Sequence, residues 1–341
     1  MASGLNADRY YLLDGLRAIS ILLVLACHLL PLGPAVLRFN EAAGAMGMSL
    51  FFALSGFLIT SRLLDNTDIV EFLARRLARI LPLSYTYTLV VFTVIYFSPV
   101  HILWTDLFTI NYMRQYLVSG LNNHLWSLCV EIHFYVAIGL AVALAGRRAI
   151  WLVWPACLLV TLLRFQQSAY LAIETHLRVD EILAGACVAT ALASLPALKN
   201  VARIRLVMFG AAACWAVASH SSAGSFQCLR PYATAVLLFA SIQYGRVSPN
   251  TVLCSRPLRY IADISYALYV IHPATAYGWM NEGGSYARYF LKRPISFVLT
   301  FGLAHLSTFH LERNAQNFAK AWLRKRRADK LVAAAPASEV G

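Results

Sequence analysis

Charged residues are scarce in this chain of 341 residues: they make up 13% of it, whereas hydrophobic residues make up 59%. A soluble domain is about a quarter charged, so this chain has too little polar surface to cover a soluble globule. Its seven cysteines form no Cys-x-x-Cys pair, which argues against a disulfide scaffold and a metal site. Long apolar runs, in contrast, recur from Leu12 to His310 and predict an all-α membrane protein.

About ten transmembrane helices can be drawn on these runs, and they predict a polytopic helix bundle. The predicted spans are 12–32, 44–63, 80–99, 124–145, 149–165, 178–195, 204–219, 231–247, 259–280 and 290–310. Spans of about 20 residues each leave short loops and no separate soluble domain. The segment 100–123 is too polar to span a membrane, and we expect a loop there with a partly amphipathic piece.

The net charge of +13 is concentrated in short loops and at the C-terminus. Nucleic-acid binding would need a basic face instead, so we expect no such partner. With the N-terminus in the cytoplasm, most Lys and Arg residues outside the spans fall on the inner side, as the positive-inside rule requires. We therefore expect both termini to be cytoplasmic, in a multi-pass protein of the inner (plasma) membrane. Residues 1–315 form its transmembrane domain and 316–341 a basic cytoplasmic tail.

Three ionisable residues interrupt the first span, Asp14, Arg17 and His28. Asp14 and Arg17 also argue against a cleavable signal peptide. A charge at the bilayer centre costs about 2.5–3.5 kcal/mol, so such residues usually face the bundle interior. By helical geometry the three share one face, with His28 about 16 Å along the axis from Arg17. An imidazole can take a proton from a hydroxyl. The structural alternative is an i,i+3 pair of Asp14 with Arg17, and a backbone carbonyl for His28.

An arginine cluster follows the second span in a predicted loop, at Arg75, Arg76 and Arg79. The planar fork of a guanidinium suits phosphate oxygens, so this cluster is a candidate site for a phosphate-bearing substrate. The alternative is that it sets the topology and attracts anionic lipid headgroups.

Further ionisable residues lie in or near the later spans. They are Glu131, Arg178, Asp180, Glu181, His272 and Glu312. Glu131 has no nearby cation in the sequence, so we expect its partner on another helix, the first span being the preferred place. Asp180 and Glu181 have a structural alternative, which is pairing with Arg178. Ser55 lacks a Gly-x-Ser-x-Gly context, and in its Leu-Ser-Gly-Phe run it is typical of close helix packing.

Several spaced motifs together resemble the acyltransferase-3 family of integral-membrane O-acyltransferases, from Tyr11 to Glu312. The matching positions are Arg17 and His28 with ten residues between them; Gly47, Phe51, Phe52, Ser55, Gly56 and Phe57; Arg76 and Arg79; Trp126, Ser127, Leu128, Glu131, Phe134 and Tyr135; Arg178, Asp180 and Gly185; and Ser265, Tyr266, Tyr269 and His272. The family more often has a Glu-Gln pair where this chain has Ile132 and His133.

The resemblance implies transfer of an acyl group, usually acetyl from acetyl-CoA, to a hydroxyl of a carbohydrate or lipid-linked oligosaccharide. About 30 residues follow the last predicted span, which leads us to expect the standalone type, like exopolysaccharide or nodulation-factor acetyltransferases. We expect acetyl-CoA as co-substrate, with no permanently bound cofactor and no metal. The expected roles are catalysis for His28, as general base, with Arg17, Glu131 and Asp14; donor binding for Arg75, Arg76 and Arg79; and acceptor binding or support for Arg178, Asp180, Tyr266 and His272.

Two other classes of protein stay open at this stage. Buried Asp, Arg, His and Glu residues also build the proton relays of secondary transporters and flippases. Transporters tend to contain repeats, and we find no similarity between 1–165 and 170–320. A scaffold for polysaccharide assembly without catalytic activity is the third possibility.

Overall fold

The computed structural model describes residues 7–247 and 252–334, and every regular element in these ranges is helical. The helices of eight or more residues are α1 (Ala7–Leu29), α2 (Phe39–Asp65), α3 (Ile69–Val90), α4 (Pro99–Asp106), α5 (Trp126–Ala145), α6 (Val153–Gln166), α8 (Asp180–Ser194), α9 (Val201–Ser219), η6 (Ser221–Leu229), α10 (Arg230–Val247), α11 (Arg256–Asp263), α12 (Ser265–Thr275), α13 (Arg293–Leu306) and α14 (Arg313–Ala334). Short helical pieces connect them at η1 (Ala35–Leu37), η2 (Val91–Ile95), η3 (Arg114–Tyr116), η4 (Asn123–Leu125), η5 (Gly146–Leu152), α7 (Thr175–Arg178), η7 (Gly278–Asn281), η8 (Ala287–Lys292) and η9 (Ser307–Glu312). The predicted all-α bundle is confirmed.

Six continuous helical stretches in the described part of the chain are long and apolar enough to cross a membrane. Two of them, 123–166 and 287–330, have 44 residues each, more than the roughly 20 that one span needs. The stretches around α8, α10 and α11–α12 are not among the six, so the count of ten spans stays a prediction. The expected interruption at 100–123 is present, because α4, η3 and η4 replace a long helix there.

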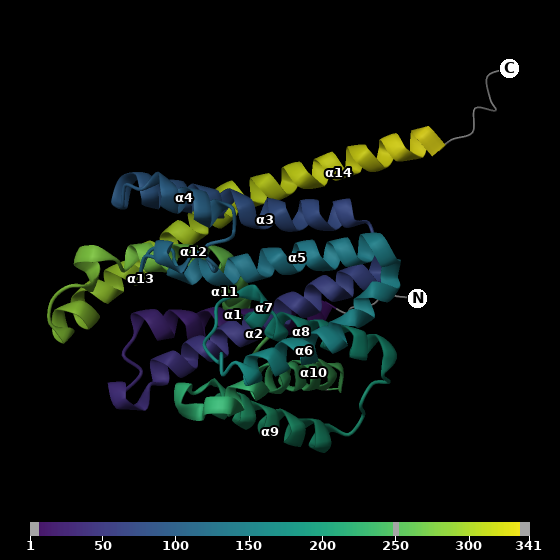
Figure 1. The fold of residues 1–341 in the computed structure, drawn as a ribbon, viewed down its shortest axis with the longest axis horizontal. Coiled ribbons are helices and arrows are strands. Elements are labelled where there is room, and N and C mark those ends of the chain that lie inside the picture. Colours follow the sequence, from purple (N-terminus) through teal and green to yellow (C-terminus); the bar gives the residue numbers. More distant parts are fainter. Residues whose placement is uncertain (1–6, 248–251, 335–341) are drawn as a thin grey trace.

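The bundle is organised around the crossing of α2 and α8, which lie side by side in its middle (Figure 1). Their backbones touch at Gly56 and Gly185. A Cβ on Gly56 would lie 1.8 Å from the carbonyl oxygen of Ile182, and one on Gly185 would lie 1.9 Å from that of Ala53. Small residues allow such close approach in membrane helices. This agrees with the packing expected for the Ser-Gly run of the second span.

The arginine cluster lies inside a helix, which corrects the predicted loop between the second and third spans. Helix α3 begins at Ile69, eleven residues before the predicted start of its span, because the Asp68 side chain accepts the backbone N–H of Glu71 at 2.9 Å and caps it. Pro82 lies within the same helix; prolines are tolerated in membrane helices. Arg75, Arg76 and Arg79 are therefore held on one rigid element.

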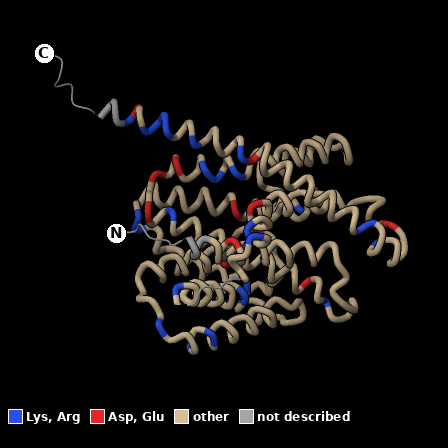
Figure 2. The backbone as a smooth tube through the Cα atoms, turned by 180° about the vertical axis from the view of Figure 1, so that it is seen from behind, with Lys and Arg blue, Asp and Glu red and all other residues tan. Residues whose placement is uncertain are grey.

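The last helix continues directly from α13 through η9 into α14, so the predicted boundary at 315/316 falls within a helix. The division into two domains stays a prediction, and residues 335–341 of the expected tail lie outside the described residues. Helix α14 packs along α3 and projects beyond the bundle (Figure 1). Its basic residues lie beside the acidic connection of α2 to α3 (Figure 2). Arg326 pairs with Asp68 at 2.8 Å, and Arg327 pairs with Glu71.

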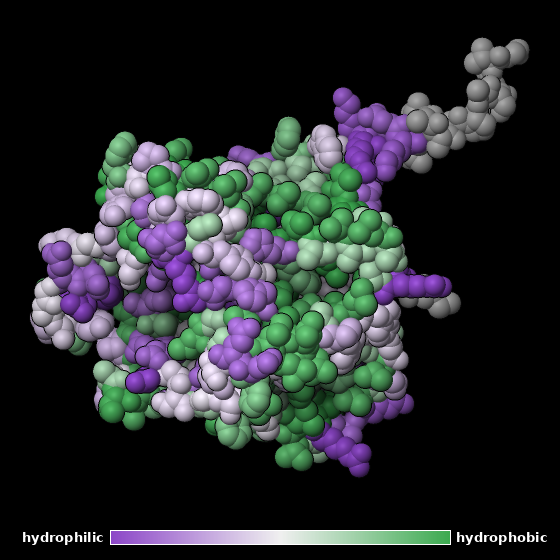
Figure 3. Space-filling model, in the orientation of Figure 1, coloured by the Kyte–Doolittle hydropathy of each residue, from purple (hydrophilic) through white to green (hydrophobic). Residues whose placement is uncertain are grey.

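Apolar side chains cover much of the visible face of the bundle, and hydrophilic ones lie at both ends, on α14 and in a band across the left and middle of the face (Figure 3). The start of α1 and the end of α14 lie at the same end of the bundle (Figure 1). An apolar exterior with polar ends fits a bundle whose helices cross a bilayer.

Candidate active site

A central cavity between α1, α2, α3, α5 and α12 brings several of the predicted site residues together. The cavity is small, with a volume of about 30 Å³, and its lining residues are Arg17, Phe51, Leu54, Ser55, Leu58, Arg76, Arg79, Ile80, Glu131, Tyr135 and Tyr266. They come from helices far apart in sequence. Three guanidinium groups and a single carboxylate therefore converge on one space inside the bundle.

Glu131 is held by two hydroxyls and not by a cation. The hydroxyls of Ser55 and Tyr135 both donate to its Oε1, and the carboxylate is buried. The expected partner on the first span is only partly found: Arg17 lines the same cavity but makes no ion pair with Glu131 in the described structure. Ser55 thus has a polar role besides helix packing, which the sequence reading missed.

Arg17 and Tyr266 complete the polar lining. Arg17 pairs with Asp14 at 3.6 Å, as the i,i+3 alternative predicts, yet its side chain keeps 17% exposure toward the cavity. The hydroxyl of Tyr266 donates to the carbonyl of Ile80 at 2.7 Å and ties α12 to α3. Asp14 does not line the cavity and acts on it through Arg17.

A wider cavity of about 350 Å³ adjoins the central one and shares Leu58, Arg76 and Arg79 with it. Its basic residues, Arg62, Arg75, Arg76 and Arg79, are called the arginine mouth below. Glu71 accepts from Arg62 and from Arg75, each at 3.0 Å. Arg76 and Arg79 form no ion pair with any described residue. Arg62 and Arg75, in contrast, share the single carboxylate of Glu71 with Arg327.

His28 does not line the central cavity, although it shares the α1 face with Arg17. It is exposed near the end of α1, and its ring centre lies 5.2 Å from that of the fully buried His272. His124, which carried no predicted role, lies 5.5 Å from His272. These three residues are called the histidine cluster. Phe51 of the cavity stacks on Tyr269, whose ring lies 5.3 Å from that of His124, so a pair of aromatic rings separates the two sites.

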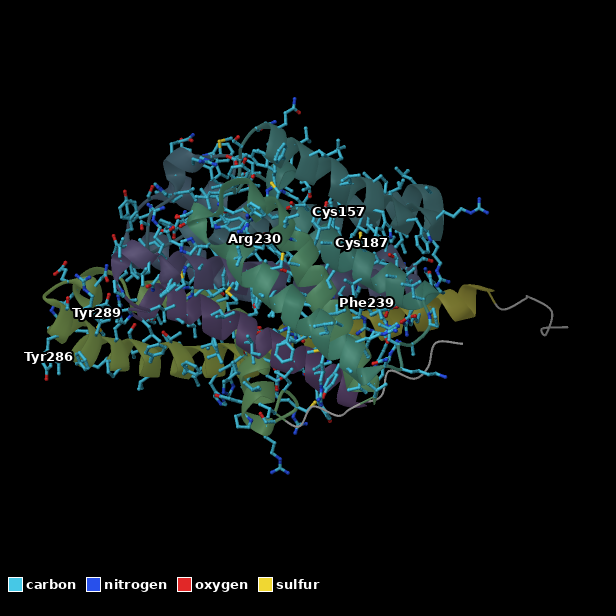
Figure 4. All side chains as sticks on the ribbon, turned by 90° about the horizontal axis from the view of Figure 1, so that it is seen from below. Cys157, Cys187, Arg230, Phe239, Tyr286 and Tyr289 are labelled. Atoms are coloured by element: carbon cyan, nitrogen blue, oxygen red, sulfur yellow. The ribbon has the colours of Figure 1, made fainter. Side chains whose placement is uncertain are left out.

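Arg178 and Asp180 lie outside the cavity, in a buried ion cluster between α6, α7, α8 and α10. Arg164 pairs with Asp180, Arg230 pairs with Glu181 at 2.7 Å, and Arg178 is 3.5 Å from Glu181. Arg230 lies within the bundle, whereas Tyr286 and Tyr289 lie at one end (Figure 4). Arg178, the partner expected for both acidic residues, therefore pairs with Glu181 only, whereas Asp180 pairs with Arg164. The sequence analysis gave no role to Arg164 or Arg230.

Glu312 accepts from the hydroxyls of Ser307 and Thr308 at 3.3 and 3.2 Å. No cluster of three or more His, Cys, Asp and Glu residues in ranges 7–247 and 252–334 is arranged to hold a metal ion. The polar chemistry inside the bundle therefore consists of guanidinium, carboxylate, hydroxyl and imidazole groups.

The sequence model described as an acyltransferase domain matches residues 10–309, which is most of the chain and includes the central cavity, the arginine mouth, the histidine cluster and the buried ion cluster, but not Glu312. The chain belongs to the acyltransferase-3 family. Membership in a family of acyltransferases favours an enzyme over the transporter and the scaffold.

Among curated relatives, this acyltransferase-3 chain is similar to the peptidoglycan O-acetyltransferase OatA of Listeria monocytogenes, with 29% identity over 174 residues, 44% of this chain and 24% of the relative. It is also similar to the O-acetyltransferase OatA of Staphylococcus aureus, with 30% identity over 156 residues, 38% of this chain and 24% of the relative. The matched region thus covers about a quarter of these relatives. No solved structure matches the chain.

Proposed function

We propose that this chain is a membrane O-acyltransferase that moves an acetyl group from acetyl-CoA to a hydroxyl of a cell-surface or secreted carbohydrate, in the inner membrane of a bacterium. The observation that carries the proposal is the arrangement of the arginine mouth, the central cavity and the exposed imidazole of His28 in one bundle. The relatives named for peptidoglycan O-acetylation act on a carbohydrate of this class.

The donor binds at the arginine mouth. Coenzyme A carries several phosphate groups, and a guanidinium binds phosphate oxygens in a bidentate, charge-assisted way. Arg76 and Arg79 are the best placed to bind phosphate, because in the described structure they form no ion pair, whereas Glu71 engages Arg62 and Arg75. They line both cavities, so phosphates held there direct the pantetheine arm into the central cavity and toward Arg17.

The acceptor hydroxyl approaches His28 at the other end of α1, where the side chain is exposed. His28 and Arg17 are about 16 Å apart along the helix, so the arm passes Phe51 and Tyr269 to reach the imidazole. The aromatic pair would move aside when the donor binds. It would also keep the donor cavity closed to the opposite side of the membrane when the donor is absent.

The transfer step follows general base catalysis. As the acceptor oxygen bonds to the acyl carbon, His28 takes the hydroxyl proton. The carbon–sulfur bond then breaks, and the proton passes to the departing CoA thiolate, which leaves as the thiol. Arg17, about 16 Å from His28 along α1, binds the donor on its way to the imidazole. Asp14 orients Arg17, and Glu131, with Ser55 and Tyr135, fixes the wall of the cavity.

A transfer assay with radiolabelled acetyl-CoA on membranes from producing cells tests this proposal. Label should become covalently attached to a carbohydrate fraction with the wild-type chain and fall about 10²-fold or more with His28→Ala. His305→Leu, in α13 and outside both sites, is the matched control and should keep full activity. Transfer at full rate by a normally inserted His28→Ala protein would overturn the base assignment.

The acceptor is identified by comparing surface glycans and lipid-linked oligosaccharides from cells with and without the gene. Mass spectrometry should find one class that gains the mass of one acetyl group only in the presence of the gene. A gain that corresponds to a longer acyl chain would retain the enzyme class but change the donor. No acylated product in any fraction would contradict the proposed function.

A further inference from the structure

The histidine cluster contains two imidazoles whose protons can be located from the backbone around them. In His272, Nδ1 lies 2.8 Å from the carbonyl oxygen of Tyr269 and 3.2 Å from that of Leu268. A carbonyl can only accept, so this nitrogen carries the hydrogen. In His124, Nε2 lies 3.1 Å from the carbonyl oxygen of Val270 and is the protonated nitrogen for the same reason.

The second nitrogen of each ring then carries a lone pair that has no hydrogen-bond donor in the described structure. Nε2 of His272 and Nδ1 of His124 are buried and accept no hydrogen bond from any described residue. A buried polar atom left unpaired is costly, and its presence in a folded protein indicates a partner that arrives in some state of the molecule. Both rings are too buried for bulk water to serve as that partner.

The neighbouring hydroxyls are already committed elsewhere. Tyr269, next to both rings, donates to the carbonyl of His124, and the hydroxyl of Ser127 lies 2.6 Å from the Tyr269 oxygen and serves as its donor. The hydroxyl of Tyr87 donates to the carbonyl of Leu121 at 2.6 Å. None of the three has a hydrogen left for an imidazole.

His28 is the remaining donor beside His272. It makes no hydrogen bond to the described residues, and the two ring centres are 5.2 Å apart. An imidazole nitrogen lies about 1.2 Å from the centre of its ring. If each of the two rings turns one nitrogen toward the other ring, those two nitrogens are therefore about 2.8 Å apart, which is the length of a good hydrogen bond. Because His28 is exposed, its ring can rotate into this position.

We propose that His272 is a positioning residue whose Nε2 accepts the N–H of His28 and thereby turns the other nitrogen of His28 toward the acceptor hydroxyl. This inference rests on the proposed function, in which His28 is the base. Nε2 of His272 performs the task that a carboxylate performs in a Ser-His-Asp triad, where it fixes the tautomer and the orientation of the catalytic imidazole. A neutral acceptor suits this place, because a buried carboxylate would add a charge within the membrane.

The test measures the kinetics of acetyl transfer with radiolabelled acetyl-CoA in membranes that contain equal amounts of inserted protein. His272→Leu removes the acceptor and should lower kcat about 10²-fold, while the KM for acetyl-CoA stays within about twofold because the arginine mouth is untouched. His272→Gln keeps an amide oxygen near the place of Nε2 and should recover at least about tenfold of that loss. His305→Leu, a histidine of α13 that contacts Tyr260 and Phe309, is the matched control.

A double variant separates positioning from a general structural role. If His272 acts through His28, then His28→Ala and the His28→Ala/His272→Leu double variant should have the same residual rate. A further loss in the double variant, full activity in His272→Leu, or a Gln variant no better than Leu would overturn the inference. Full activity in His28→Ala would instead overturn the proposed function on which it rests, so the two failures are distinguishable.

Discussion

Two groups of charged side chains lie inside this bundle, and they differ in how completely they are paired. In the buried ion cluster, Arg164, Arg178 and Arg230 meet Asp180 and Glu181, and these side chains are at most 6% exposed. In the central cavity, Arg76 and Arg79 form no ion pair with any residue that the structure describes, and Arg17 has only the longer contact to Asp14. Charges that neutralise one another hold helices together, whereas charges left unpaired beside open space are available to a substrate.

The largest effect should come from breaking a pair in the buried ion cluster. Asp180→Ala leaves Arg164 charged and without its partner in a fully buried place, which costs about 3–5 kcal/mol. We expect a large fall in the melting temperature, or in the yield of folded protein on size exclusion in detergent. The double variant Arg164→Met/Asp180→Leu removes both charges and should recover most of the loss. If the Asp180→Ala variant were as stable as the wild type, the paired charges would not hold the helices together, and the contrast between the two groups would be wrong.

The same kind of change in the central cavity should affect activity and leave stability nearly unchanged. Glu131→Gln removes the negative charge but keeps an amide oxygen that the hydroxyls of Ser55 and Tyr135 can still reach. Because hydrogen bonds to a charged carboxylate that fix the cavity wall are replaced by weaker ones, we expect acetyl transfer to fall about tenfold, with a melting temperature within a few degrees of the wild type. A variant that loses folding and activity together would place Glu131 with the structural charges.

Within the arginine mouth, the paired and unpaired residues should separate in donor affinity. A hydrogen bond to a charged group contributes about 1.5–3 kcal/mol, so Arg76→Gln and Arg79→Gln should each raise the KM for acetyl-CoA by roughly tenfold or more. Arg75→Gln should have a smaller effect, because Glu71 already engages that side chain. Arg148→Gln, at an exposed position outside the mouth, is the control. Equal effects at all four positions would indicate general attraction and not a site.

The smallest effect is expected where α14 meets the connection of α2 to α3. The backbone N–H of Glu71 and the guanidinium of Arg326 hold the pKa of Asp68 below its usual value. Because the folded pKa is lowered, this contribution is complete above the unfolded pKa of about 4 and is lost as the pH falls through the folded value. Arg326→Gln should therefore cost about 0.5 kcal/mol or less near neutral pH.

Melting temperatures of the wild type and Arg326→Gln, compared across pH, check this prediction. The difference between the two proteins should be largest near pH 7, should shrink below about pH 4 as Asp68 takes up a proton, and should also shrink in high salt. A difference that grows on acidification would mean that Asp68 is not the partner that Arg326 depends on.

Much of the fold followed from the sequence because lipid restricts the possibilities to helices or closed barrels, and runs such as 44–63 are long and apolar enough to be recognised. The start of α3 was missed by eleven residues. Arg75, Arg76 and Arg79 lower the local hydropathy and Pro82 suggests a break, yet the cap at Asp68 and the packing of α14 along α3 continue the helix through them. Local composition does not contain those long-range contacts.

The sequence predicted which residues belong to the candidate site better than it predicted which of them lie together. Ionisable side chains in apolar runs single out Arg17, His28, Glu131 and His272, because their burial in lipid is costly. Helical periodicity put Arg17 and His28 on one face, but it could not place Phe51 and Tyr269 between the cavity and the histidines. It also could not predict that the hydroxyl of Ser55 donates a hydrogen bond to Glu131, because the residues around Ser55 indicated helix packing alone.

The sequence by itself determined that the protein lies in a lipid bilayer, that it is helical, and which of its charged residues are costly to bury. Each of these depends on composition and on spacing along one helix. The tertiary structure alone decided which charges neutralise one another. Arg164 meets Asp180, and Arg230 of the neighbouring helix α10 meets Glu181, whereas Arg76 and Arg79 line the two cavities. Pairing depends on distances between helices, and these are set by how closely residues such as Gly56 and Gly185 let the backbones approach.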